Sequence, residues 1–170
     1  MIEKIDRYYL EILFEDNFKK KSKPSEDYNI ELIDSNNFEI NKFFYKQIGK
    51  KYQWIDRLVW SNNDWIKYVS NKNLKTFVLK KKDQLVGYFE LILNNEINDS
   101  EIAYLGILEE YFKRGCGSYL LSEAIKKSFD SGAKRVWVHT CSLDHPNAIE
   151  NYKSRGMKIF KTETLKRRAI

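Results

Sequence analysis

Two glycines and two basic residues stand together before an amphipathic helical pattern in the segment EEYFKRGCGSYLLSEAI. Gly115 and Gly117 remove the Cβ atoms that would keep a ligand away from the main chain. The first N–H groups of a helix have no partners within it, and the helix dipole favours negative charge there. Lys113 and Arg114 add formal positive charge beside these groups. The residues of the turn, 113–118, therefore predict a phosphate-binding site.

Two common phosphate-binding motifs do not fit this turn. No GK[ST] sequence ends it, which argues against a Walker loop. Gly115 and Gly117 match the first two glycines of a dinucleotide fingerprint, but the third position holds Leu120. On these residues alone, an ordinary strand-to-helix turn stays open beside the anion site.

Hydrophobic spacing predicts the elements that must position this turn, in the order β, β, α, α, β, β, β, α, β, α, β. The expected strands are residues 5–13, 28–33, two strands within 76–93, 101–108, 135–140 and 157–165. The expected helices are residues 37–52, 61–71, 117–130 and a last one from Pro146 to Gly156. The strand–helix–strand order of the second half implies parallel pairing there. We therefore expect an α/β (α+β) fold: a mixed central sheet of about six or seven strands with helices on both faces.

Two motifs of this region, in this order, resemble signatures of the GNAT family of acyl-CoA-dependent N-acyltransferases. The family pattern Q/R-x-x-G-x-G/A opens the third helix of its fold, and here it falls on Phe112, Lys113, Arg114, Gly115, Cys116 and Gly117. The second signature, A-x-x-x-Y before a G-F-like turn, falls on Ala148, Tyr152, Gly156 and Met157. The resemblance extends from about residue 28 onward and implies the GNAT fold. The strings EIAYLGIL, VWVHTCSLDHP and YYLE also resemble a narrower, little-described bacterial GNAT subgroup.

The resemblance implies acetyl-CoA as a cosubstrate and no metal. The main chain of the fourth core strand would pair with the pantetheine amides at Leu105, Gly106 and Ile107. The diphosphate would lie on the turn formed by Phe112, Lys113, Arg114, Gly115, Cys116, Gly117 and Ser118. Phe112 stands where the family usually has Gln or Arg, so side-chain help to the phosphates should be weaker, and Arg114 is the candidate to compensate.

Three side chains are the catalytic candidates that the resemblance implies. Tyr152 matches the tyrosine that protonates or hydrogen-bonds the departing CoA thiolate in many members. Glu101 matches a glutamate that some members use as the base toward the amine. His145 stands where the family usually has Asn. It would contact the CoA arm, act as a base oriented by Asp144, or cap the helix beside Pro146, and these alternatives stay open.

Two further residues are candidates for binding the acceptor. Glu90 could face the same cleft from the strand next to Glu101, although pairing with a cation is its alternative role. Trp54, in the segment YQWIDRLVW, falls in the region that lines the acceptor pocket of the family, although core packing is common for such an aromatic. His139, Cys141 and His145 have the spacing H-x-C-x-x-x-H, which gives too few ligands for an expected zinc site.

The composition indicates one globular domain, residues 1–170, in which residues 1–27 form an N-terminal strand and a basic loop. The chain is 42% hydrophobic and carries a net charge of +6. The basic runs sit at turns and at the C-terminus, alternating with acidic stretches, so nucleic-acid binding is not the expected role. No apolar run or signal sequence indicates a membrane, and two cysteines do not make a disulfide framework. A cytoplasmic location is the expectation.

The resulting prediction is an N-acetyltransferase that moves an acetyl group from acetyl-CoA to a primary amine by direct attack in a ternary complex. An unknown small molecule is the expected acceptor. A catalytically idle acyl-CoA-binding module is one alternative, and an acetyltransferase acting on a protein or peptide amine or on a charged tRNA is another. GNAT proteins are often dimers, which makes a homodimer an expectation.

Overall fold

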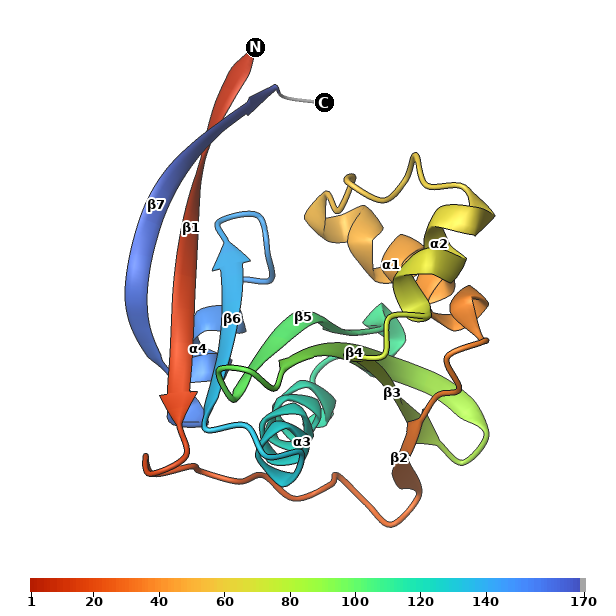
Figure 1. The fold of residues 1–170 in the computed structure, drawn as a ribbon, viewed down its shortest axis with the longest axis vertical. Coiled ribbons are helices and arrows are strands. Elements are labelled where there is room, and N and C mark those ends of the chain that lie inside the picture. Colours follow the sequence, from red (N-terminus) through yellow and green to blue (C-terminus); the bar gives the residue numbers. More distant parts are fainter. Residues whose placement is uncertain (169–170) are drawn as a thin grey trace.

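A computed structural model describes residues 1–168 and shows one mixed sheet of seven strands in the order β2-β3-β4-β5-β6-β1-β7 (Figure 1). The strands are β1 (Ile2–Leu13), β2 (Tyr28–Leu32), β3 (Leu74–Lys81), β4 (Gln84–Asn94), β5 (Asp99–Ile107), β6 (Arg135–Cys141) and β7 (Lys158–Arg168). The helices are α1 (Phe38–Tyr52), α2 (Asn62–Val69), α3 (Cys116–Asp130) and α4 (Ala148–Ser154), with a 3₁₀ turn η1 at Glu109–Tyr111. The predicted fold class is confirmed.

Helices cover both faces of the sheet (Figure 1). α1 and α2 lie over one face, while α3 packs against β4, β5 and β6 on the other and contacts α4. α3 is amphipathic, and its buried side includes Leu120, Leu121, Ala124 and Ile125, which join the main core. α2 begins with a capping box between Ser61 and Asp64. Apolar spacing therefore places α3 on the sheet, and a capping box sets the start of α2.

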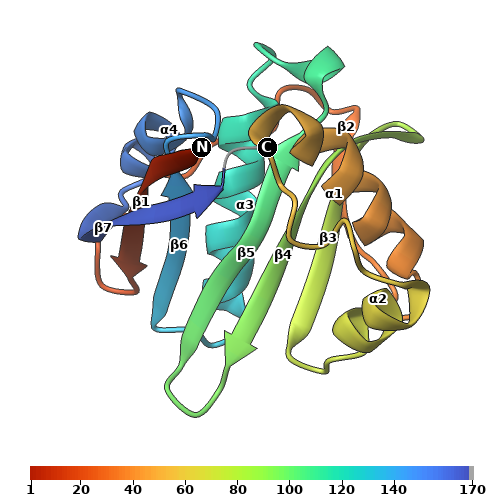
Figure 2. The same ribbon diagram turned by 90° about the horizontal axis from the view of Figure 1, so that it is seen from above.

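The N-terminal strand occupies a position that the local sequence does not reveal. β1 lies between β6 and β7 and is antiparallel to both, with Tyr9 opposite His139 on β6 and Lys161 on β7. Parallel pairing in the second half of the chain is therefore limited to β5 and β6, because β1 separates β6 from β7. β1 and β7 extend together beyond the rest of the sheet, and Ile2 pairs with Arg168 at that end (Figures 1 and 2).

The central feature of the sheet is the wedge between β5 and β6. These parallel strands pair only over Asp99–Glu101 and Arg135–Trp137, and then they part. Figure 2 shows them converging at one end and separating toward the other, with α3 beyond the opening. β5 continues to Ile107 with only its β4 edge paired. The wedge leaves main-chain groups of a central strand open to a ligand.

The last helix begins later than expected. Ala148 is its first residue and Asn147 its N-cap, so Pro146 lies in the preceding turn instead of at the first helical position. Asp144 holds that turn, because its carboxylate accepts hydrogen bonds from the Thr140 hydroxyl and the Cys141 amide. These side-chain bonds stabilise the turn and delay the helix start.

Candidate active site

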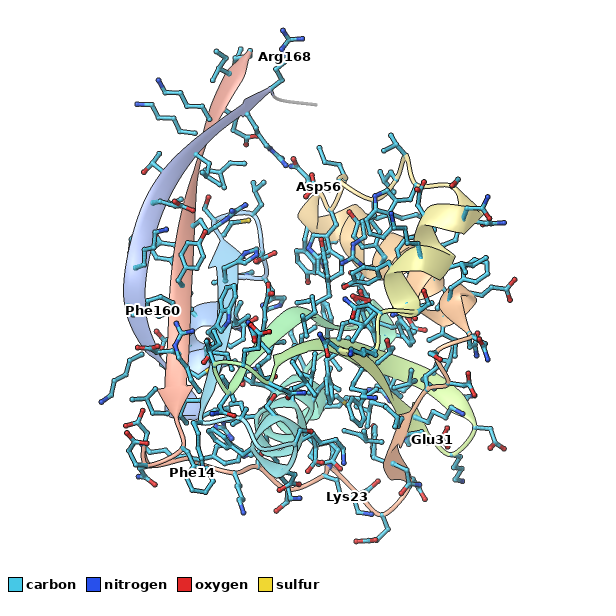
Figure 3. The ribbon with its side chains drawn as sticks, in the orientation of Figure 1. Phe14, Lys23, Glu31, Asp56, Phe160 and Arg168 are labelled. Carbon is cyan, nitrogen blue, oxygen red and sulfur yellow. The ribbon has the colours of Figure 1, made fainter. Side chains whose placement is uncertain are left out.

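The wedge opens into a cavity of about 860 Å³ that runs from the N-terminus of α3 to the segment joining α1 and α2. Asp56 from that segment and residues 165–167 from β7 line its outer end. Figure 3 shows Asp56 near α1 and Arg168 at the end of β7. Five cationic and three acidic side chains line the cavity: Arg7, Arg57, Lys113, Lys166 and Arg167, against Asp56, Glu101 and Asp144. This excess of positive charge favours an anionic ligand.

The predicted phosphate-binding turn forms the inner end of the cavity. Phe112, Lys113, Gly115, Cys116, Gly117 and Ser118 line it, whereas Arg114 does not. Within residues 1–168, none of the six amide N–H groups of residues 113–118 donates a hydrogen bond to a protein acceptor. Gly115 is the N-cap, with a φ of 78° that favours glycine. The helix N-terminus therefore offers free amides, and the residues that carry them, except Arg114, line the open cavity, which fits a diphosphate.

The unpaired edge of β5 continues the site from this turn. Leu105, Gly106 and Ile107 all line the cavity, as the resemblance implies. Gly106 is required by close packing, because a Cβ atom there would lie 2.7 Å from Cγ2 of Ile48 on α1. The strand edge offers main-chain donors and acceptors to an extended ligand that carries amides, which fits a pantetheine arm.

Glu101 lies at the point where β5 and β6 part. It is opposite Trp137, lines the cavity and takes part in no ion pair within residues 1–168. Burial raises the pKa of its carboxyl above the ordinary value, and the nearby charge of Arg57 opposes this only in part. A carboxylate with a raised pKa is a better proton acceptor near neutral pH than an ordinary glutamate.

Tyr152 reaches the same cavity from α4. Its side chain is buried, and its hydroxyl makes no hydrogen bond to the protein within residues 1–168, yet it is not among the polar atoms sealed from the cavity. Burial, with a smaller contribution from the charge of Asp144, raises the pKa of Tyr152. The phenol therefore keeps its proton at neutral pH and has an unused donor pointing at the ligand space.

His145 lies in the turn before α4 and lines the cavity. Its ring meets Phe112 edge-on, with centroids 5.4 Å apart, and lies 6.3 Å from the ring of Tyr52. Its Nδ1 accepts a hydrogen bond from the Asn147 amide, so the ring caps the start of α4. Asp144 makes no hydrogen bond to His145 and does not orient it as a base. Phe112 thus helps to hold His145, in place of the phosphate contact that Gln or Arg would make.

Trp54 lines the cavity, and its role toward the acceptor stays a prediction. Its ring packs edge-on against Tyr104, with centroids 4.9 Å apart. Its Cβ lies so close to Gly49 of α1 that a Cβ atom added there would be 2.7 Å away. Tyr104 also lines the cavity, three residues after Glu101 along β5. Aromatic rings therefore line the acceptor end, together with the carboxylates of Asp56 and Glu101.

The structure places Glu90 outside the cavity lining and fully buried. Its carboxylate accepts hydrogen bonds from Arg57 Nη1 at 3.1 Å, Tyr68 Oη at 2.7 Å and Asn41 Nδ2 at 2.8 Å. Arg57 itself lines the cavity. The structure therefore shows the alternative role of Glu90, which is pairing with a cation. The sequence signal for Arg57 is weak: it stands next to Asp56 in an aromatic-rich segment.

Comparison with protein families gives one match, to the acetyltransferase (GNAT) family over residues 33–157. The chain belongs to the GNAT acetyltransferase family. The matched range of this GNAT protein contains the wedge, the phosphate-binding turn and α4, whereas the cavity-lining residues of β1 and β7 lie outside it. A comparison with curated protein sequences gives no match. The narrower bacterial subgroup stays a prediction.

Solved structures share the fold of this GNAT protein at low sequence identity. A GCN5-related N-acetyltransferase from Sphaerobacter thermophilus aligns with a TM-score of 0.73 and 15% identity over 95% of this chain and 50% of that one. The aminoglycoside acetyltransferase meta-AAC0020 from an uncultured soil sample gives 0.66 and 15%, over 79% and 90%. The ribosomal-protein-S18-alanine N-acetyltransferase of Escherichia coli gives 0.59 and 14%, over 76% and 76%. This chain spans about half the length of the Sphaerobacter protein.

Two further observations bear on the setting of this GNAT domain. Among residues 1–168, no three His, Cys, Asp or Glu side chains are grouped so that they could hold a metal ion. In the same part of the chain, no helix combines the length and the apolar character needed to cross a bilayer.

Proposed function

We propose that this chain is an acetyl-CoA-dependent N-acetyltransferase that acts on the primary amine of a small molecule by direct attack in a ternary complex. The observation that carries the proposal is the row of free amides at residues 113–118, which faces a cavity continuous with the open edge of β5. A diphosphate on the turn and a pantetheine arm along the strand edge would place a thioester between Glu101 and Tyr152. Acetyl-CoA supplies the acetyl group in activated form.

Glu101 takes a proton from the acceptor amine, because an ammonium group has no lone pair for attack. Its raised pKa and its lack of an ion pair support this role. As the bond from nitrogen to the acetyl carbon forms and the carbon–sulfur bond breaks, Tyr152 donates its proton to the departing sulfur. The nitrogen loses its second proton as the amide forms, and this proton restores the Tyr152 phenol, while the proton on Glu101 passes to solvent. The products are an amide and the free thiol. Positioning by the main chain contributes the larger part of the rate enhancement.

His145 and Trp54 have supporting roles in this proposal. The histidine holds the turn before α4 against Phe112 and thereby the CoA side of the cavity. The tryptophan forms the wall of the acceptor pocket with Tyr104. Glu90 acts on the acceptor through Arg57 and not by direct contact.

Calorimetric titration with acetyl-CoA tests the first half of the proposal, and release of free thiol in the presence of an amine panel tests the second. We expect micromolar binding, on the order of the usual KM range, and thiol release that requires an amine. Absence of acetyl-CoA binding overturns the proposal. Binding without turnover of any amine would instead favour the idle acyl-CoA-binding module, and strongly salt-dependent RNA binding would favour a charged-tRNA substrate.

A further inference from the structure

Arg57 is a buried cation at the acceptor end of the cavity. Only 7% of the residue is exposed, yet it is among the cavity-lining residues. Its guanidinium carbon lies 4.0 Å from the ring centroid of Tyr68, 4.3 Å from that of Tyr104 and 4.8 Å from that of Trp60. Aromatic rings therefore pack against the guanidinium, and the N–H groups at its edges remain to bind a partner.

One edge of this guanidinium is already fixed by the protein. Nη1 donates to Glu90 Oε1, and Glu90 is itself held by Tyr68 and Asn41, so residues of β4, α2 and α1 together fix the charge. Burial disfavours the cation, but the Glu90 charge outweighs this, and the pKa of Arg57 is raised. The desolvation of Arg57 is thus offset before any ligand arrives.

The other edge stays open. Within residues 1–168, Nη1 is the guanidinium nitrogen of Arg57 that donates a hydrogen bond to the protein, and neither Nε nor Nη2 is among the buried polar atoms without a partner. Because Arg57 lines the cavity, Nε and Nη2 are the donors that it has left for a ligand there. Nε and Nη2 form the side-on fork of an arginine, whose two parallel N–H groups match the two oxygens of a carboxylate.

Glu101 faces the same end of the cavity, and Arg57 lies close enough for its charge to act on the pKa of that carboxyl. One fixed anion-binding fork and one proton acceptor thus stand near each other between aromatic walls. We propose that Arg57 binds the carboxylate of the acceptor, and that the acceptor is a free amino acid whose amine faces Glu101. This inference rests on the proposed acetyltransferase function and names its substrate class.

The test compares acceptors that differ only at the carboxylate. Thiol release from acetyl-CoA is measured with a panel of common amino acids, each beside its carboxamide and its decarboxylated amine. We expect kcat/KM of the best amino acid to exceed that of its matching amine by on the order of tenfold or more, since a charge-assisted bond is lost with the carboxylate. Turnover of the amines without preference for the acid, or no turnover of any amino acid, overturns the inference.

Variants of Arg57 separate recognition from folding. Because Arg57→Gln alone leaves Glu90 as an unpaired buried charge, the test variant is the double change Arg57→Gln with Glu90→Gln, which removes both charges of the pair. It should lower kcat/KM for the acid far more than for the matching amine, and so remove the preference for the acid. Arg57→Lys keeps the charge without the fork and should lower the preference in part. Arg135→Gln, which removes a guanidinium outside the cavity, is the control and should leave the preference unchanged.

The outcomes also separate this inference from the proposed function. A protein that does not bind acetyl-CoA contradicts the proposed function itself. A protein that binds acetyl-CoA and acetylates an acid, its amide and its amine equally well contradicts only the role of Arg57. A double variant that melts like the wild type and still prefers the acid also contradicts only the role of Arg57, because the ratio of kcat/KM for the acid to that for the amine would then not depend on its guanidinium.

Discussion

Glu101 on β5 and Trp137 on β6 are partners in the last residue pair that joins these two strands. Beyond this pair the sheet splits, so the candidate base stands at the apex of the cavity. The split edge of β5 leads from Glu101 to the free amides of residues 113–118. One departure from regular pairing thus creates the ligand groove and places a carboxylate where the two strands part.

Replacement of Glu101 by Gln tests this carboxylate as the base. The change keeps shape and removes the proton acceptor, so we expect kcat/KM to fall about a hundredfold or more. Acetyl-CoA affinity, measured by calorimetry, should stay unchanged because the turn at residues 113–118 is untouched. A variant with wild-type turnover at neutral pH would contradict the assignment.

The pH dependence of the wild type follows from the same group. Burial raises the pKa of Glu101, so kcat/KM should fall as the pH drops through a value above the ordinary 4.5. The same pKa shift affects the free energy of unfolding in the opposite direction. A raised carboxyl pKa stabilises the fold below the unfolded pKa, and this contribution is lost as the pH rises through the folded value. Glu101→Gln should therefore raise the Tm at pH 7 and not at pH 4, as thermal melts at both pH values would show.

Replacement of Tyr152 by Phe tests the proton donor toward sulfur. Only the hydroxyl is removed, and it makes no hydrogen bond to the protein within residues 1–168, so the fold should tolerate the change. We expect kcat to fall about a hundredfold with little change in the KM for the amine. Tyr119→Phe, on the buried side of α3 and outside the cavity, is the matched control. Equal losses of kcat in Tyr152→Phe and Tyr119→Phe would mean that the effect comes from packing and not from a lost proton donor.

Local signals predict the phosphate-binding turn and α3, because glycine geometry, helix capping and apolar spacing all act over a few residues. The same holds for the hairpin of β3 and β4. The place of β1 could not be predicted, since its two neighbours are chosen by pairing with residues more than a hundred positions away. The role of Glu90 was hidden for a similar reason: a sequence shows a carboxylate, but not that Arg57 and Asn41 meet it in the fold.

A pair of glycines tests the close packing between the N-terminal loop and the end of α4. Gly132 and Gly156 both have positive φ, 94° and 107°, so alanine is strained at either position. A Cβ at position 132 meets no atom within 4 Å, whereas at position 156 it would lie 2.5 Å from the main-chain oxygen of Asn17. We expect Gly132→Ala to cost about 1 kcal/mol and Gly156→Ala clearly more. Equal Tm values for the two variants would contradict this packing.

The Arg57–Glu90 ion pair should also dominate the stability of the acceptor side. The pair is buried at both ends, with side-chain exposures of 8% and 0%. Glu90→Ala leaves the guanidinium without its counter-charge, so we expect a loss of about 3–5 kcal/mol in the free energy of unfolding, measured by urea denaturation. Asp130→Ala breaks the exposed pair with Lys126 on α3 and should cost less than about 1 kcal/mol. Because Nη1 of Arg57 is then free to move, Glu90→Ala should also weaken the preference for acidic acceptors, whereas Asp130→Ala should not. A small loss for Glu90→Ala would mean that solvent reaches the pair, and Arg57 would then lack the fixed geometry that acceptor recognition requires.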